Sequence, residues 1–358
     1  MASPACAANR RPRRPGRVCE RGIVPLKLGI FSVVDHYPAE LPRTAARLYD
    51  ELLEQVEAAD ALGFDSFWIA EHHFHEYGAI PRPPIWMAAA AQRTRRIRLG
   101  SAVVVLPFDN PLRTAEDYAL VDVLSGGRLN LGVGSGYLTH EYDGFGIDPE
   151  EKRDRFDEAL DIVLHAWRGE RFSYSGKYHR VSDVALNVRP LQRPRPPVWI
   201  AVLRNEAARL VGEKGFPMMM IPYATTERID ELAETTRVFR EAFGRAGGRP
   251  EDATVPFGLH THCAETTTLA RGEAREPMDR YVRTRLYAKQ RPFDLLVEKD
   301  LVAIGDADEV TRVARRYAAA GLTHFLALSS FGGLPHRQVL SSMERLARHV
   351  MPALSSLG

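Results

Sequence analysis

Short apolar runs rich in Val, Ile and Phe alternate, from residue 26 onward, with longer segments whose apolar residues recur at helical spacing. This alternation predicts parallel strands, because a helix between two strands returns the chain to the end at which the next strand begins. The predicted strands are residues 26–34, 64–70, 97–106, 128–133, 197–202, 217–221, 254–262 and 324–329, and the predicted helices are residues 44–62, 84–94, 112–124, 150–167, 204–214, 227–246, 307–320 and 336–350. Eight such units close most simply into a (β/α)8 TIM barrel of the α/β class.

Two stretches interrupt this rhythm and are predicted as insertions into the barrel. Residues 172–184 alternate aromatic and polar side chains around a Ser-Gly-Lys turn, which predicts a small hairpin after the fourth helix. Residues 263–304 are densely charged and lie between the seventh and eighth strands. A segment that leaves the carboxyl end of a barrel strand is placed to act as a lid, and the alternative is a helical excursion that packs outside the barrel.

The charges are unevenly distributed along the chain. Residues 1–25 hold six arginines and one acid, whereas the whole chain has 48 basic and 46 acidic residues. The Pro, Ala and Arg content of this stretch, without apolar periodicity, predicts a disordered tail at 1–25 ahead of one barrel domain at 26–358. The domain itself is slightly acidic, so no nucleic-acid partner is expected.

Composition also bears on membranes and disulfides. No apolar run approaches the ~20 residues that a membrane span needs, so no membrane partner is expected. The three cysteines are Cys6, Cys19 and Cys263. So small and odd a number encodes neither a disulfide framework nor a zinc site, and it fits a reducing, cytoplasmic location.

The residues after the second predicted strand carry a dense set of titratable groups. The run Glu71-His72-His73-Phe74-His75-Glu76 holds three imidazoles and two carboxylates. Active sites of TIM barrels lie where strands end, so this run is a candidate for catalysis. Because side chains alternate along an extended segment, we expect His72 to point opposite to Glu71 and His73, so that only some members face one ligand.

Small residues at the ends of the next strands indicate room for a flat ligand. The third strand ends in Gly100-Ser101-Ala102-Val103, and the fourth ends in Gly132-Val133-Gly134-Ser135-Gly136. Small side chains let a ring or a phosphate approach the backbone, and ordinary barrel filling is the alternative for the third strand. After the fifth strand, Val202-Leu203-Arg204-Asn205 opens a helix whose N–H groups and Arg204 side chain suit a phosphate.

These motifs resemble those of the bacterial luciferase-like flavin-dependent monooxygenases, over roughly residues 26–350. The ordered matches at strand ends are Trp68-Ile69-Ala70-Glu71-His72-His73-Phe74, Leu99-Gly100-Ser101-Ala102-Val103-Val104-Val105-Leu106-Pro107, Pro111-Leu112-Arg113-Thr114-Ala115-Glu116-Asp117, Leu124-Ser125-Gly126-Gly127-Arg128, Gly132-Val133-Gly134-Ser135-Gly136 and Glu141-Tyr142-Asp143-Gly144-Phe145-Gly146. The resemblance returns at Pro197-Val198-Trp199-Ile200-Ala201 and at Gly215-Phe216-Pro217.

The resemblance implies a TIM barrel that binds reduced FMN, supplied by a separate flavin reductase, and activates O2 as a flavin C4a-peroxide to oxygenate a small organic substrate. It also implies a homodimer through the early barrel helices. The implied site residues surround the flavin: His72 as the catalytic histidine, Ala102 and Val103 as a non-prolyl cis peptide beneath the ring, Glu141 as a nearby acid, and Leu203, Arg204 and Asn205 at the phosphate.

Two positions depart from the family pattern. Gly134 stands where luciferases place a reactive cysteine beside the flavin, and Ser135 stands where they place a phosphate-binding arginine. Arg204 is therefore expected to supply the missing charge at the phosphate. Light emission does not follow from the resemblance.

Flavin-based oxygenation requires that water be kept from the site, which a barrel mouth under a long segment allows. The aromatic residues near strand ends, together with His73, are predicted to line the substrate pocket: Phe31, Phe74, Tyr77 and Phe108. With an ordinary pKa near ~6.5, the His72 imidazole exchanges protons at neutral pH, and we hypothesise that it is the general acid/base. The Arg and Ala richness fits a GC-rich genome and suggests natural-product biosynthesis as the setting.

Three alternatives to this function stay open. An F420-dependent oxidoreductase of the same fold would transfer hydride without O2; the Glu71–Phe74 motif favours FMN, and Ser135 weakens that preference. A metal-dependent hydrolase would use His73-x-His75 and His260-x-His262, whose spacing places two imidazoles on one side of a strand, although no metal is predicted. A non-catalytic flavoprotein subunit is the third, and the presence of His72 argues against it.

Overall fold

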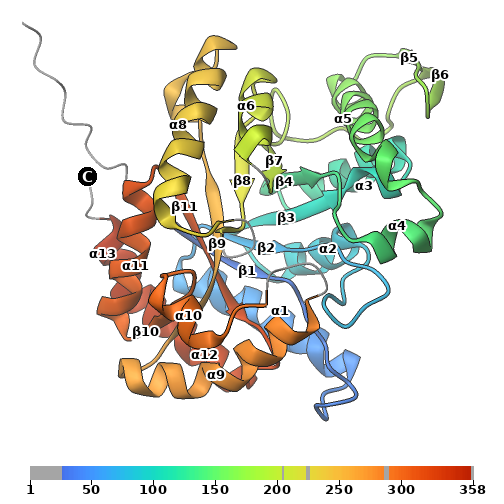
Figure 1. The fold of residues 1–358 in the computed structure, drawn as a ribbon. Coiled ribbons are helices and arrows are strands. Elements are labelled where there is room, and N and C mark those ends of the chain that lie inside the picture. Colours follow the sequence, from blue (N-terminus) through green and yellow to red (C-terminus); the bar gives the residue numbers. More distant parts are fainter. Residues whose placement is uncertain (1–25, 204, 223–225, 286–289, 356–358) are drawn as a thin grey trace, which may run out of the picture.

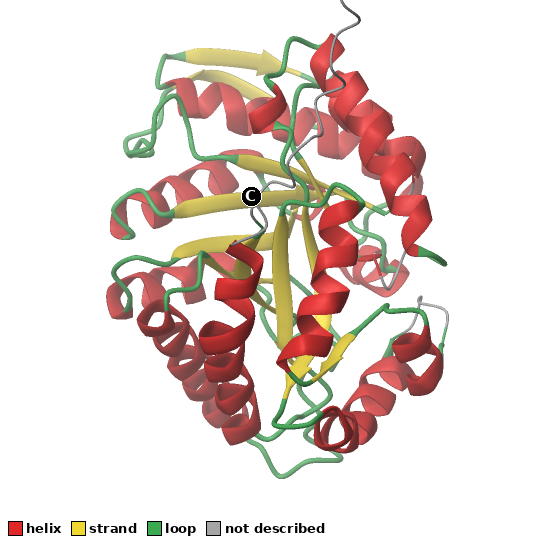
Figure 2. Ribbon diagram, turned by 90° about the vertical axis from the view of Figure 1, so that its left-hand side faces the viewer, coloured by secondary structure: helices red, strands yellow, loops and turns green. Residues whose placement is uncertain are grey.

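In the computed structural model, eight parallel strands form a closed barrel surrounded by helices (Figures 1 and 2). The structure describes residues 26–203, 205–222, 226–285 and 290–355. The barrel strands are β1 (Lys27–Ser32), β2 (Ser66–Ile69), β3 (Arg98–Val105), β4 (Leu129–Gly134), β7 (Val198–Val202), β8 (Met218–Met220), β9 (Pro256–Cys263) and β11 (His324–Ser330). They pair in that order and β11 pairs with β1, so the predicted TIM barrel is confirmed.

Helices follow the strands and cover the outside of the barrel: α1 (Ala45–Leu62), α2 (Pro83–Arg93), α3 (Pro111–Leu124), α5 (Lys152–Arg168), α6 (Asn205–Glu213), α8 (Ile229–Arg245), α11 (Ala307–Ala319), α12 (His336–Arg345) and, after a π-helical turn at Leu346–Val350, α13 (Met351–Ser355). In α1 the Thr44 side chain accepts the N–H of Arg47, and Gly63, at a φ of 84°, ends the helix. Local capping therefore sets both ends of this helix. Of the helices that the structure describes, none combines the length and the apolar character needed to cross a membrane.

Side chains of β9 divide between the barrel interior and the helical layer. The ring of Phe257 faces outward and stacks on Tyr317 of α11. The next residue, Gly258, faces inward, where a Cβ atom would come within 3.1 Å of the Phe31 ring. Since Phe31 belongs to β1, on the far side of β11, its buried ring lies inside the barrel.

The predicted hairpin is confirmed as β5 (Phe172–Ser175) and β6 (Arg180–Val184), which pair antiparallel beside α5, away from the barrel strands (Figure 1). A carboxylate of α5 holds its turn. Glu158 accepts the backbone N–H of Lys177 at 2.8 Å and that of Tyr178 at 3.0 Å.

The stretch predicted as a lid or an excursion forms α9 (Thr267–Thr284), α10 (Phe293–Glu298) and β10 (Ala303–Gly305). β10 pairs with β9 as a strand outside the ring. One side of α9 is buried along its length, as expected for a helical excursion that packs outside the barrel. The buried residues on this side include Ala270, Ala274, Met278 and Tyr281. The last turn of α9 nevertheless reaches the carboxyl ends of the barrel strands, where Tyr281 contacts His260 of β9.

One short helix was not predicted. The helix α4 (Thr139–Phe145) follows β4 and ends at Gly146, which has a φ of 66°. Seven residues are too few to show a helical period in the sequence. The helix matters because it carries Glu141.

Candidate active site

A carboxylate from α4 holds the histidine that follows β2. Nδ1 of His72 lies 3.0 Å from Oε1 of Glu141, and the backbone N–H of His73 donates to the same oxygen at 2.9 Å. His72 is 9% exposed and Glu141 is 1% exposed. Because a carboxylate accepts the proton on Nδ1, it orients the ring and leaves Nε2 as the nitrogen for proton exchange with a ligand.

The chain turns immediately after β2, which ends at Ile69. The N–H of His72 donates to the carbonyl of Ile80 at 3.2 Å, and Phe74 adopts a left-handed φ of 59°. Across this turn the His72 ring packs against Tyr77 at 4.5 Å between centroids, whereas Nε2 of His73 lies 3.2 Å from Oε1 of Glu71. The prediction that His72 points opposite to Glu71 and His73 is confirmed.

The aromatic residues predicted as one pocket wall lie in separate places. The His73 ring packs against Phe145 of α4 at 4.8 Å and against Phe108 at 5.9 Å. Phe74 lies at the outer edge of this cluster and is 65% exposed. Phe74 and Phe108 lie with His73, Tyr77 lies with His72, and Phe31 lies inside the barrel.

The ends of β3 and β4 form a surface of small residues, of which Ala102 and Val103 are half-buried and Gly134 is buried. The peptide bond between Ala102 and Val103 is cis, as the resemblance implies. A Cβ atom at Gly134 would lie 2.7 Å from Cγ2 of Val103, so the two strand ends approach closely because residue 134 has no side chain. Ser135, also half-buried, accepts the hydroxyl of Tyr142 at its carbonyl oxygen. A surface of this kind, beside a buried histidine, fits a flavin ring.

The predicted phosphate site lies where β7 meets α6. Val202 is buried at the end of β7, Leu203 is exposed, and α6 begins at Asn205. The N–H groups of a helix's first turn are suited to a phosphate. Arg204, which was expected to add charge there, lies outside the described residues.

Burial controls the ionisation of the His72 site. Burial lowers the pKa of His72 from its ordinary value, against the hydrogen bond and charge of Glu141, which raise it. The charge of Arg285 adds to the lowering. Burial raises the pKa of Glu71, against its hydrogen bond with His73. His72 is therefore neutral at pH 7 and able to accept a proton.

Three residues that the sequence analysis did not select join Tyr77 beside His72, and we call Tyr77, Tyr137, Tyr281 and Arg285 the tyrosine–arginine cluster. Arg285 donates to the hydroxyls of Tyr281 and Tyr137 at 3.3 Å each. The Tyr281 hydroxyl donates to the Tyr77 hydroxyl at 3.4 Å. The Tyr77 hydroxyl also lies 3.5 Å from the Tyr137 hydroxyl. In the sequence, the one indication of this cluster is that Tyr281 and Arg285 are four residues apart, the spacing that places two side chains on the same face of a helix, within the segment predicted as a lid.

His260 and His262, two of the histidines that a metal-dependent hydrolase would use, contact different side chains. His260 is fully buried, with its ring 4.3 Å from that of Tyr281. Nε2 of His262 lies 2.7 Å from Oε2 of Glu273. Within the described part of the chain, no three His, Cys, Asp or Glu side chains are grouped so as to hold a metal ion.

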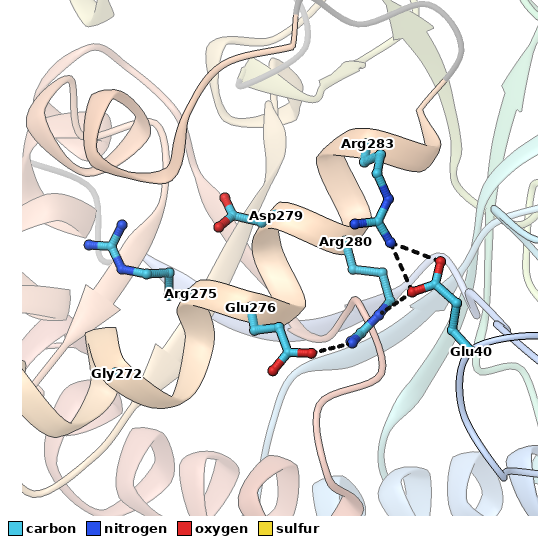
Figure 3. A pocket seen from close by; sticks show the side chains of 7 residues that line it. All are labelled: Glu40, Gly272, Arg275, Glu276, Asp279, Arg280 and Arg283. Atoms are coloured by element: carbon cyan, nitrogen blue, oxygen red, sulfur yellow. Dashed lines mark hydrogen bonds and ion pairs between the residues drawn. The ribbon is translucent and has the colours of Figure 1, made fainter.

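A surface pocket of about 360 Å³ lies on α9, outside the His72 site (Figure 3). The side chain of Arg280 crosses it, donating to Glu40 at 3.1 Å and to Glu276 at 2.6 Å. Arg283 donates to Glu40 at 2.8 Å. Because Glu40 lies in the loop after β1, these ion pairs hold α9 against that loop. The pocket is lined by Glu40, Gly272, Arg275, Glu276, Asp279, Arg280 and Arg283.

The chain is similar to known redox enzymes along most of its length. The family model described as luciferase-like monooxygenase matches residues 26–324. The crystal structure of monooxygenase RslO1 from Streptomyces bottropensis has a TM-score of 0.85 and 31% identity, covering 91% of this chain and 99% of its own. The oxygenase component of flavin-dependent trigonelline monooxygenase from Acinetobacter baylyi is 26% identical, over 87% of this chain and 92% of its own. The F420-dependent glucose-6-phosphate dehydrogenase of Amycolatopsis mediterranei is 28% identical, over 86% and 95%.

Proposed function

This chain belongs to the luciferase-like monooxygenase family, and from that premise we propose that it oxygenates a small organic substrate with reduced FMN and O2. Reduced FMN, when bound, supplies the electrons that activate O2 for transfer of one oxygen atom to the substrate. The observation that carries the proposal is the buried His72–Glu141 pair, 3.0 Å apart, at the end of β2. The small residues Ala102 and Val103 lie at the same end of the neighbouring strand β3.

His72 and Glu141 have different roles in this proposal. Glu141 is a positioning residue, because it accepts the Nδ1 proton and so directs Nε2 to the reacting groups. His72 is the catalytic residue, which takes up a proton at Nε2 and returns it later in the cycle. Burial keeps its imidazole neutral at pH 7, so it acts first as a base. General acid/base groups of this kind contribute roughly 10²- to 10⁴-fold to a rate.

Other residues bind the cofactor and exclude water. The surface of Ala102, Val103 and Gly134 holds the isoalloxazine ring. Glycine is needed at position 134 because a side chain there would displace Val103 from this surface. The residues between the end of β7 and the start of α6 hold the phosphate: Val202, Leu203, Arg204 and Asn205, with Ser135 after β4. The tyrosine–arginine cluster packs beside His72 and keeps bulk water from it.

We also propose that a separate flavin reductase supplies the reduced FMN in the cytoplasm. The similarity to an oxygenase component supports a separate reductase, and the small number of cysteines supports a reducing compartment. A homodimer is proposed through α2 and α3, which pack side by side and expose apolar side chains that a partner copy would bury: Ile85, Leu120, Val123 and Leu124.

Anaerobic titration with reduced FMN and, separately, with reduced F420 tests the cofactor. We expect saturable binding of reduced FMN and much weaker binding of F420. An oxygen pulse should then produce a transient absorbance band distinct from reduced and oxidised flavin, and isotopically labelled O2 should leave one label in the product. Tight binding of F420 in place of FMN, with hydride transfer and no use of O2, would overturn the proposal in favour of a dehydrogenase of the same fold.

A further inference from the structure

The tyrosine–arginine cluster gathers a guanidinium and three phenols at one point of the barrel end. The two nitrogens of Arg285 bond different hydroxyls, those of Tyr281 and Tyr137, which come from α9 and from the loop after β4. The guanidinium also lies over the Tyr77 ring at 4.9 Å from its centroid. Elements far apart in the sequence thus converge on one cation. The guanidinium only donates hydrogen bonds, whereas each phenol hydroxyl both donates and accepts.

Among the arginines of α9 and its caps, Arg280 and Arg285 are buried. Arg285 is 7% exposed and Tyr281 is fully buried, whereas Arg283, two residues earlier, is exposed and pairs with Glu40. Hydrogen bonds from a guanidinium to an anion strengthen where water is scarce, because the local dielectric constant is low. A buried guanidinium among phenol hydroxyls is therefore chemically suited to a carboxylate.

The cluster lies against the candidate catalytic residue. The His72 ring packs edge-on against Tyr77 at 4.5 Å and against Tyr137 at 6.4 Å between centroids. The charge of Arg285 reaches His72, whose pKa it lowers. An anionic group bound by Arg285 would consequently place the rest of its molecule within reach of the His72 side chain.

The cluster is also held in place from outside. Arg280, one turn before Thr284, bonds Glu40 and donates to the carbonyl of Gly332 at 2.6 Å. These bonds fix α9 against the loops after β1 and β11. The last turn of α9, which ends in Arg285, is thereby positioned before any ligand arrives, which reduces the entropy lost on binding.

We propose that the tyrosine–arginine cluster is a subsite that binds a carboxylate of the organic substrate, and that this chain therefore acts on anionic substrates. The inference rests on the proposed function, since it assigns a substrate class to the same site. The flavin phosphate is the competing source of an anion. We assign the substrate, because the cluster packs against His72, whereas the phosphate candidates Val202 to Asn205 lie where β7 meets α6.

Benzoate and its neutral analogue benzamide are the probes, titrated into the FMN-loaded protein and, separately, into the apoprotein by calorimetry. We expect the wild-type chain to prefer benzoate by on the order of tenfold or more. Arg285→Gln should abolish this preference and Arg285→Lys should retain part of it. The matched control Arg283→Gln, on the exposed turn of α9, should keep the wild-type ratio.

Equal or undetectable binding of the two probes by the wild-type chain would overturn the proposal, as would a preference that survives Arg285→Gln. A loss of FMN affinity in Arg285→Gln with riboflavin affinity unchanged would assign Arg285 to the phosphate and overturn it as well. If that variant does not fold, Tyr137→Phe should still lower the benzoate preference several-fold, and an unchanged ratio would contradict the subsite. The apoprotein titration keeps a failure of FMN binding separate from a failure of the subsite.

Discussion

One carboxylate oxygen, Oε1 of Glu141, accepts both the Nδ1 proton of His72 at 3.0 Å and the backbone N–H of His73 at 2.9 Å. Glu141 thereby fixes both the His72 imidazole and the peptide group of His73. His72 and Glu141 are 69 positions apart in the sequence, on the loop after β2 and on the short helix α4 respectively. The site therefore depends on how β4 and α4 are placed against β2.

The first prediction concerns this oxygen. Glu141→Gln keeps a hydrogen-bond acceptor near His72 but removes the charge that stabilises the imidazolium, so we expect turnover to fall by roughly 10- to 100-fold with KM little changed. Reductase-coupled kinetics measure both quantities. Glu273→Gln, which alters the similar pair with His262 away from the site, is the matched control. Wild-type turnover in Glu141→Gln would show that Glu141 does not position His72.

The second prediction is a pH dependence. Burial lowers the pKa of His72, so its imidazole is neutral at pH 7 and becomes charged only below its ordinary value of 6.5. Turnover that needs neutral His72 should be level above about pH 7 and fall as the pH drops through the lowered pKa. His72→Gln should bind FMN with wild-type affinity and lose this acid limb along with most of its rate. Persistence of the limb in His72→Gln would assign it to another group.

The third prediction concerns the surface beneath the proposed flavin. The Cβ atom of Gly134→Ala would lie 2.7 Å from Cγ2 of Val103, whose β-branched side chain has few other rotamers. We expect the variant to fold and to bind FMN on the order of tenfold more weakly, as measured by flavin fluorescence quenching. Gly244→Ala, in open space on α8, should leave FMN affinity unchanged. Equal affinities of the two variants would contradict the proposed ring position.

The fourth prediction concerns oligomeric state. Leu120→Lys places a charge in the exposed apolar face of α2 and α3, which the proposed dimer buries. Sedimentation should show a dimer for the wild-type chain and a monomer for Leu120→Lys. Leu269→Lys, at an equally exposed leucine of α9, should remain dimeric. A wild-type monomer at micromolar concentration would remove the proposed interface.

The fifth prediction concerns stability in acid. Burial lowers the pKa of His260 from 6.5 to about 3. Below pH 6.5 His260 is protonated in the unfolded chain but stays neutral in the folded chain. The contribution of His260 to the free energy of unfolding is therefore present in full well above pH 6.5, and it falls by up to ~1.4 kcal/mol per pH unit as the pH drops below 6.5. Between about pH 6.5 and 5, His260→Gln should therefore lose about 1.6 kcal/mol less of its free energy of unfolding than the wild-type chain.

Urea denaturation at both pH values measures this difference. His349→Gln, which removes an exposed histidine near the end of the chain, is the control and should keep the wild-type dependence on pH. Parallel behaviour of wild type and His260→Gln would mean that His260 is protonated in the folded state.

Some features of the site were predictable because they depend on short stretches of chain. The alternation of side chains after β2 predicted that His72 and His73 face opposite sides, and the Ala102–Val103 motif predicted its cis peptide through the family resemblance. The sequence did not show that Phe74, at a left-handed turn, would be mostly exposed. Local patterns thus located the segments that carry the site but not the partners of each side chain.

The sequence alone determined the barrel, because hydrophobic periodicity is set within each strand and helix, and eight repeated units leave one simple closed arrangement. Tertiary structure decided which polar groups meet. The bond between Glu141 and His72 spans 69 positions, and that between Tyr281 and Tyr77 spans 204. Neither contact has a local signature, because each forms only when the closed barrel brings the carboxyl ends of its strands, and the loops and helices that follow them, to one end of the molecule.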